Sequence, residues 1–360
     1  MSRDADFRAA LALFERLREL DPAARVQALA EAAPPVPVLA LLQRLLAADE
    51  VASPLLDAPP AMPTGIDAEH TPGQPGDDAS GQRIGRWQLT GLLGRGGMSV
   101  VYRARSLQPP LGQEAALKRL ALPTPDAAAI ARFEREMAIL VRLRHPAIAP
   151  LLDAGIDAEG LPWFAMGLVE GEPIDRWAEQ RALDTAARLR LCLQACDAVA
   201  HAHRHLVVHR DIKPGNVIVD DEGRVVLLDF GISRVLEEGE SAQTSSGSYA
   251  FTPRYAAPEQ RAGGIVSTAT DVYGLGALLH MLLLRQPVDL PEGEDAPRLP
   301  NDGLPPDLAA ILRRALARDP ARRYPSAEAL AADINAWLSG RPVQARRGGA
   351  GYRLRRFIGR

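Results

Sequence analysis

The stretch Val207–Asp220 reads VVHRDIKPGNVIVD, and it places three different functional groups in one loop that runs into a strand. They are the carboxylate of Asp211, the ammonium group of Lys213 and the carboxamide of Asn216. A carboxylate can accept or orient a hydroxyl proton, a lysine can neutralise phosphate charge, and a carboxamide oxygen can bind Mg²⁺. A solvated polar loop would explain any one of these residues, but it explains the whole set poorly. The stretch therefore predicts a site that handles phosphate and metal.

A further carboxylate follows in the next strand-like run, VVLLDFGIS, in which Asp229 comes after four consecutive apolar residues. This pattern predicts a buried strand that carries Asp229 to the mouth of a cleft. Ligation of Mg²⁺ by oxygen is the chemistry that suits a carboxylate there. Taken alone, an aspartate in a turn at a strand end would be the simpler interpretation.

Two further features, a glycine-rich turn and a lysine on a strand, lie N-terminal to these two stretches. The run LGRGGMSVVY, residues 93–102, puts Gly94, Gly96 and Gly97 in a turn between two strands, where backbone N–H groups can approach phosphate oxygens. Lys118 lies on one face of the strand EAALKRL, and the helix that follows carries Glu136, which we expect to hold the Lys118 ammonium in place. Alone, these features would be a flexible turn and a solvated lysine.

The bulk composition limits the class of protein. The 360 residues have a net charge of −3, which argues against bulk electrostatic binding of nucleic acid. The two cysteines, Cys192 and Cys196, have helical spacing and are expected to be a buried apolar pair. The N-terminus has no signal-peptide pattern, and no uncharged apolar run approaches the roughly 18 residues of a membrane span. We therefore expect a cytoplasmic protein, membrane-proximal if the natural chain continues into a span.

Composition divides the chain into four regions. Residues 1–52 have apolar residues at helical spacing and predict a short helical N-terminal segment, residues 53–82 form a Pro/Gly-rich linker, and residues 341–360 form a basic tail. The main domain, residues 83–340, begins with short strands and continues as helices, so we expect an α+β fold. Its strand-rich lobe would span residues 83–166 and its larger helical lobe residues 170–340, with ligands between them.

In this order, the motifs resemble the protein kinase family. The matching motifs are G-x-G at Gly94 and Gly96, A-x-K ending at Lys118, H-R-D ending at Asp211, Asn216, D-F-G at 229–231 and A-P-E at 257–259. The resemblance covers roughly residues 84–338. The resemblance implies the bilobal kinase fold, with a small antiparallel-sheet N-lobe that carries one main helix and a larger helical C-lobe. Lysine two residues after Asp211 is typical of the serine/threonine branch. The expected function is therefore transfer of the γ-phosphoryl of ATP to serine or threonine hydroxyls of proteins.

The resemblance also implies a role for each matching residue. Asp211 would be the catalytic base, Lys213 a γ-phosphate contact, Lys118 a contact to the α/β-phosphates that pairs with Glu136, and Thr252 a contact to Asp211 and Lys213. Asn216 and Asp229 would bind Mg²⁺, for which Mn²⁺ could substitute. The implied nucleotide-binding residues are Gly94, Gly96, Gly97, Val101, Ala116, Lys118, Met166, Gly167 and Val169.

Further implied residues are structural or regulatory. Asp271 would brace the catalytic loop, and Glu259 would pair with Arg323. Arg210 would bind a phosphate on the activation segment, so self-association for autophosphorylation is expected. The candidate phosphorylation sites in that segment are Thr244, Ser245, Ser246 and Ser248.

Four positions depart from the family pattern. Ser99 stands where a third glycine is usual, Phe251 replaces a glycine ahead of Thr-Pro, Gly274 replaces a serine, and Gly167 replaces an acidic residue of the connector between the lobes. No departure removes a group that does chemistry. They bear on substrate preference and nucleotide affinity rather than on the reaction.

Two alternative functions share this fold. A pseudokinase scaffold usually lacks the lysine, the catalytic aspartate or the metal aspartate, and all three are present here. A small-molecule phosphotransferase is not expected to keep Ala257-Pro258-Glu259 at the end of an activation segment. The run GGMSVVYRA, the motif PEQ and the helical head resemble bacterial, eukaryotic-like kinases, notably the cytoplasmic part of receptor-like kinases. The arginine-rich tail is either merely solvated or touches anionic lipid.

Overall fold

The computed structural model describes residues 80–96, 99–120, 127–231, 255–291, 293–299 and 303–346, together with Pro35 and Val38. The chain divides into two compact units, Met1–Pro59 and Pro60–Arg360. All elements below belong to the second unit. Several predicted features lie outside the described residues. They are the linker up to residue 79, residues 347–360 of the tail, and the predicted sites Gly97, Thr252, Thr244, Ser245, Ser246 and Ser248.

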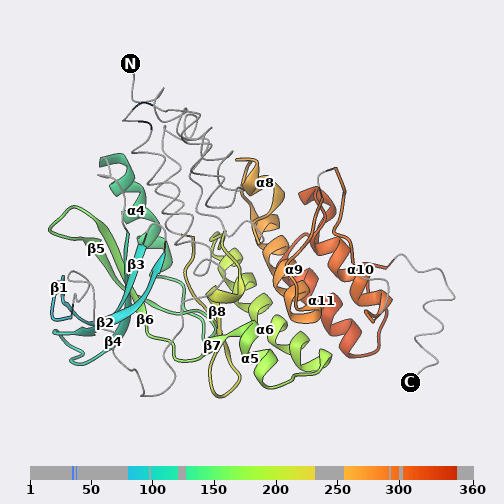
Figure 1. The fold of residues 1–360 in the computed structure, drawn as a ribbon, viewed down its shortest axis with the longest axis horizontal. Helices are drawn as coiled ribbons and strands as arrows, with labels where there is room; N and C mark the ends of the chain where they lie inside the picture. Colours follow the sequence, from blue (N-terminus) through green and yellow to red (C-terminus); the bar gives the residue numbers. More distant parts are fainter. Residues whose placement is uncertain are drawn as a thin grey trace. The chain divides into compact units, whose positions relative to one another are not determined.

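The N-lobe is built on an antiparallel sheet that is six-stranded within the described residues, in the order β1-β2-β3-β4-β6-β5 (Figure 1). The strands are β1 (Arg83–Ile84), β2 (Trp87–Gly96), β3 (Ser99–Ser106), β4 (Glu114–Leu120), β5 (Leu151–Ile156) and β6 (Pro162–Gly167). Alternation along each strand sends one set of side chains into a compact core that includes Trp87, Leu117 and Trp163. This arrangement confirms the predicted antiparallel sheet of the N-lobe and leaves Lys118 on the other face.

One helix, α4 (Ala127–Leu140), accompanies the sheet. It buries Phe133, Met137 and Leu140, which recur at helical spacing, and it packs chiefly against β5. Directly after the helix, residues 141 and 142 form a turn. The Leu143 side chain is nevertheless buried in the same core.

The C-lobe is mainly helical, and side-chain caps mark where its long helices begin. Asp184 accepts a hydrogen bond from Ala187 N at 2.7 Å at the start of α6, and Ser267 and Ser326 cap α9 and α11. Both Cys192 and Cys196 are buried in α6 without a disulfide, as predicted. The helices are α5 (Ile174–Gln180), α6 (Thr185–Arg204), α8 (Pro258–Arg261), α9 (Thr268–Leu284), α10 (Pro306–Ala315) and α11 (Ala327–Leu338), with 3-10 turns η1 (Pro214–Asn216) and η3 (Pro320–Arg322).

A small sheet carries the catalytic motifs between these helices and the N-lobe (Figure 1). Its antiparallel order is β7 (Glu172–Pro173), β8 (Val217–Val219) and β9 (Val225–Leu227). Leu227 donates to Ala147 O at 2.9 Å and accepts from Ala149 N at 3.0 Å, so the loop before β5 is bonded directly to the strand that precedes Asp229. The two lobes are therefore joined next to the candidate site.

The packed part of the C-lobe continues past the predicted boundary at residue 340. Val343 is buried, and the buried carboxylate of Asp333 accepts from Gln344 N at 2.6 Å and from Ala345 N at 2.8 Å. Arg346 Nη1 lies 2.9 Å from Oδ1 of the buried Asp307. The first six residues of the predicted tail thus belong to the lobe. Among the residues that the structure describes, no helix is long and apolar enough to cross a membrane.

Candidate active site

The loop between α6 and β8 brings the three predicted polar groups together. Asn216 Nδ2 donates to the Asp211 backbone oxygen at 2.8 Å and to Asp211 Oδ2 at 2.9 Å. Lys213 Nζ lies 3.0 Å from the same Oδ2. Both partners hold the Asp211 side chain in one orientation. Because Asn216 uses its amide nitrogen here, its Oδ1 is the atom that it can offer to a metal ion.

The residues just before Asp211 are fixed by Asp271, which is 1% exposed in α9. Asp271 Oδ2 accepts from His209 N at 2.7 Å and from the His203 ring, and Oδ1 accepts from Arg210 N at 2.8 Å. The contact predicted for Asp271 is therefore present. Arg210 has a φ of +68°, a left-handed conformation that is costly for a side chain with a Cβ and that persists only where its surroundings impose it.

His209 links the catalytic loop to the segment around Asp229. Its Nε2 lies 2.8 Å from Leu228 O, its Nδ1 accepts from Asp211 N at 3.3 Å, and its ring lies 4.7 Å from the Phe230 ring. Burial lowers the pKa of the imidazole, despite the opposing charges of Asp271 and Asp211. His209 is therefore neutral at pH 7 and serves as a bridge between loops.

The sequence-based pairing of Lys118 with Glu136 is wrong for this structure. Lys118 Nζ lies 2.7 Å from Oδ2 of Asp229, and no ion pair of Glu136 is formed within the described residues. Glu136 lies on α4, which packs chiefly on β5, and the Lys118 ammonium is bound instead by the carboxylate of Asp229. Asp229 has a φ of +50°, and its Oδ1 is buried without a hydrogen-bond partner among the described residues.

The end of the activation segment is anchored by a buried ion pair. Glu259 accepts from Arg323 Nη1 and Nη2, both at 2.7 Å, so the pair predicted from the sequence is present and bidentate. Burial raises the pKa of Glu259, but the hydrogen bonds and charge of Arg323 outweigh burial and leave this pKa below its usual value. Arg323 also donates to three backbone carbonyls, those of Ala317, Ala269 and Arg318.

The predicted nucleotide residues lie along adjoining strands. The register pairs Gly94 with Val101, Val101 with Lys118, and Ala116 with the buried Met166. Beyond Met166, the Gly167 amide donates to Pro150 O at 2.9 Å.

Two of the departures from the family pattern follow from close packing. A Cβ on Gly167 would lie 3.1 Å from Pro150 Cγ, so the connector runs too close to Pro150 for a side chain to be placed freely. A Cβ on Gly274 would lie 2.9 Å from Ile212 Cβ, so this glycine lets α9 approach the catalytic loop. Sequence reasoning missed both explanations because the contacting residues are distant in the chain.

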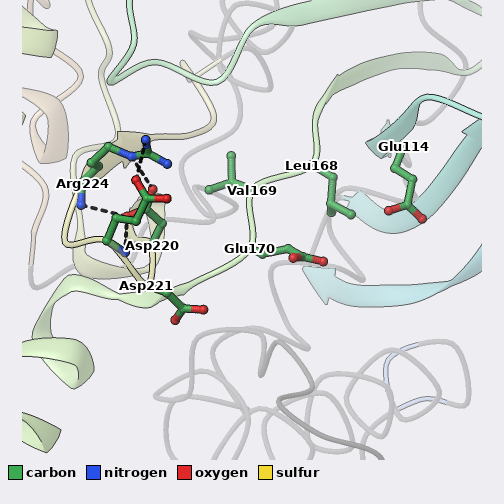
Figure 2. A pocket seen from close by; sticks show the side chains of 8 residues that line it. Glu114, Leu168, Val169, Glu170, Asp220, Asp221 and Arg224 are labelled. Carbon is green, nitrogen blue, oxygen red and sulfur yellow. Dashed lines mark hydrogen bonds and ion pairs between the residues drawn. The ribbon is translucent and has the colours of Figure 1, made fainter. Parts of the chain in front are cut away.

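A separate pocket of about 490 Å³ lies beside the connector (Figure 2). It is lined by Glu114 at the start of β4, Leu168, Val169 and Glu170 of the connector, and residues Asp220, Asp221, Glu222 and Arg224 of the β8–β9 turn. Arg224 is engaged by Asp220 and Glu222, each at 2.8 Å, so the lining is acidic. Of the predicted site residues, the lining includes only Val169.

Comparison with known proteins agrees with these motifs. A family model described as the protein kinase domain matches residues 87–333. A probable serine/threonine-protein kinase, SCO3848 of Streptomyces coelicolor, is 35% identical over 278 residues, which cover 72% of this chain and 41% of that protein. The DNA damage-responsive serine/threonine-protein kinase RqkA of Deinococcus radiodurans is 38% identical over 264 residues, covering 69% of this chain and 39% of that one.

Solved structures give the same result for the fold. The PknI kinase domain of Mycobacterium tuberculosis is 30% identical, has a TM-score of 0.56, and matches over 71% of this chain and 98% of its own length. This likeness confirms the bilobal α+β fold predicted from the sequence. The chain spans about two fifths of the length of the curated relatives that it matches.

Proposed function

The chain belongs to the protein kinase family, and from this premise we propose that it is a serine/threonine kinase of bacterial signalling that moves the γ-phosphoryl of ATP to protein hydroxyls. The observation that carries the proposal is the arrangement of Asp211, which is oriented by Asn216 and Lys213 within a loop that Asp271 holds rigidly. Phosphoryl transfer through a loose transition state needs positioning and charge neutralisation more than covalent help. These residues are suited to supply both.

Each role is the one that the resemblance to protein kinases implies, and it suits the chemistry of the group that carries it. Asp211 would accept the proton of the substrate hydroxyl or orient that hydroxyl, with Thr252 as a further contact at the same centre. Lys213 would neutralise γ-phosphate charge, and Lys118 would contact the α/β-phosphates. The Gly167 carbonyl and the Val169 amide would bond to adenine behind Met166, and the turn with Gly94, Gly96 and Gly97 would cover the phosphates.

The site is compatible with Mg²⁺, and with Mn²⁺ as a substitute. The buried Oδ1 of Asp229 has no hydrogen-bond partner among the described residues, and a hard cation would satisfy it. Asn216 Oδ1 is the second candidate ligand. Mg²⁺ commonly binds one or two protein oxygens together with substrate phosphates, so these two side chains suffice. When bound, the ion would offset charge on the phosphates.

The test compares the purified protein with its Asp211→Asn variant, each incubated with Mg-ATP and a generic basic protein. We expect phosphate on serine or threonine with the wild type, and turnover at least about a hundredfold lower with the variant, while nucleotide affinity changes little. Absence of transfer with ATP still bound would indicate a kinase that needs an activator. Absence of ATP binding would favour a scaffold function instead.

We also propose that activation involves autophosphorylation between two copies of the chain. Arg210 precedes Asp211 and carries the charge that a phosphate in residues 241–248 could pair with. Mapping phosphosites on the active protein tests this, and an active protein with that segment unmodified would refute it.

For the basic tail, we propose contact with anionic lipid, which vesicles of phosphatidylserine and phosphatidylcholine can test. Because residues 341–346 are part of the C-lobe, the deletion to compare is 347–360. Equal co-sedimentation with and without those residues would contradict lipid contact.

A further inference from the structure

Gln260 is a polar side chain that the motif roles above do not use. It is the third residue of the short helix α8, immediately after Glu259, and it is only 7% exposed. Its Oε1 accepts from Ala257 N at 3.1 Å, which caps the helix, because glutamine at this position commonly reaches back to the first free amide. Capping accounts for one end of the carboxamide only.

The other end of the carboxamide reaches the catalytic loop. Gln260 Nε2 donates to the backbone oxygen of Arg210 at 2.8 Å, across 50 residues of sequence. This oxygen belongs to the peptide group that joins Arg210 to Asp211. The hydrogen bond therefore fixes the plane of the peptide from which the Asp211 side chain extends.

The hydrogen bond from Gln260 is made to Arg210, the residue of the catalytic loop whose backbone is strained. The left-handed Arg210 has its N–H held by Asp271 and its carbonyl held by Gln260, and the preceding carbonyl, that of His209, accepts from Gly231 N at 2.9 Å. Such a conformation persists only where several contacts impose it. Gln260 supplies the contact that comes from the end of the activation segment.

We propose that Gln260 is a positioning residue, which couples α8, and with it the segment that ends at Ala257, to the orientation of Asp211. The inference rests on the proposed kinase function. A displacement of α8 would move the hydrogen-bond donor away from the Arg210 carbonyl and release the Asp211 peptide. Accurate placement of the reacting group strongly affects the rate of transfer, whereas ATP binds through other residues.

The experiment uses Gln260→Glu, which keeps the Oε1 cap and removes the amide donor. Its matched control is Gln194→Glu, because Gln194 makes the same two bonds elsewhere: Nε2 to Gly223 O at 3.2 Å and Oε1 from Val225 N at 2.9 Å. The neutral pair Gln260→Met and Gln194→Met excludes an effect of the new charge. All variants of the full chain are assayed below their melting temperatures.

We expect both Gln260 variants to lower kcat about tenfold or more, with an unchanged Kd for ATP and KM for ATP, while both Gln194 variants keep the wild-type kcat. A folded Gln260→Glu or Gln260→Met with the kcat of its Gln194 counterpart would overturn the inference. If the wild type itself neither transfers phosphate nor binds ATP, the proposed function fails instead, so the two failures are distinguishable.

Discussion

The ion pair of Glu259 with Arg323 supports a prediction about stability. The Arg323 side chain is 0% exposed and that of Glu259 12%, and both guanidinium–carboxylate contacts measure 2.7 Å. Arg323→Met would leave Glu259 without its bidentate partner and would remove one hydrogen-bond donor from each of three backbone carbonyl groups. Removing one partner of a buried pair costs about 3–5 kcal/mol of unfolding free energy. For a domain of this size, that loss lowers the melting temperature by roughly 6–20 °C.

Urea denaturation of the wild type and Arg323→Met measures this loss directly. The matched control is Arg298→Met, because Arg298 pairs with Glu294 at the surface, with the arginine 71% exposed. The control should stay within about 0.5 kcal/mol of wild type. In the double variant Glu259→Gln/Arg323→Met, part of the stability should return, because no unpaired charge stays buried. An Arg323→Met protein within about 1 kcal/mol of wild type would refute the reasoning.

Three further predictions concern the same elements. The folded-state pKa of Glu259 lies below its unfolded value. The contribution of this carboxylate to the stability of the fold is therefore present above about pH 4.5 and is lost as the pH falls through the folded pKa. Glu259→Gln should flatten this part of the pH–stability curve. Gly274→Ala should cost about 1–3 kcal/mol in denaturant titrations, because the new Cβ would meet Ile212 Cβ at 2.9 Å; an unchanged midpoint would contradict this. Asp271→Asn should lower kcat about tenfold or more in the assay with Mg-ATP and the basic protein, since one acceptor oxygen becomes a donor facing backbone amides. Wild-type turnover would count against the bracing role.

The sequence was sufficient for the fold and for the residues of the catalytic loop, because their spacing is local. Asp211, Lys213 and Asn216 lie within six residues of one another, so any loop of that sequence brings them close. The partner of Lys118 could not be obtained in this way, since it depends on how α4 packs on the sheet. Nothing in the sequence indicated that residues 341–346 belong to the C-lobe, because Asp333 has the pattern of an ordinary helical aspartate and its role as a buried acceptor exists only in the folded chain.

The charge pairs discussed above are of two kinds. Partly exposed pairs at the cleft bear on catalysis, whereas the buried pair bears on stability. At the cleft, Lys118 with Asp229 and Lys213 with Asp211 are single contacts whose side chains are 15–29% exposed. Water screens such pairs, so exchanging one partner for a phosphate oxygen or a cation costs little. The pair of Glu259 with Arg323 is bidentate and nearly free of solvent, so it cannot exchange partners without a large penalty. Substitutions at the cleft should therefore act on turnover, whereas Arg323→Met should act on unfolding first.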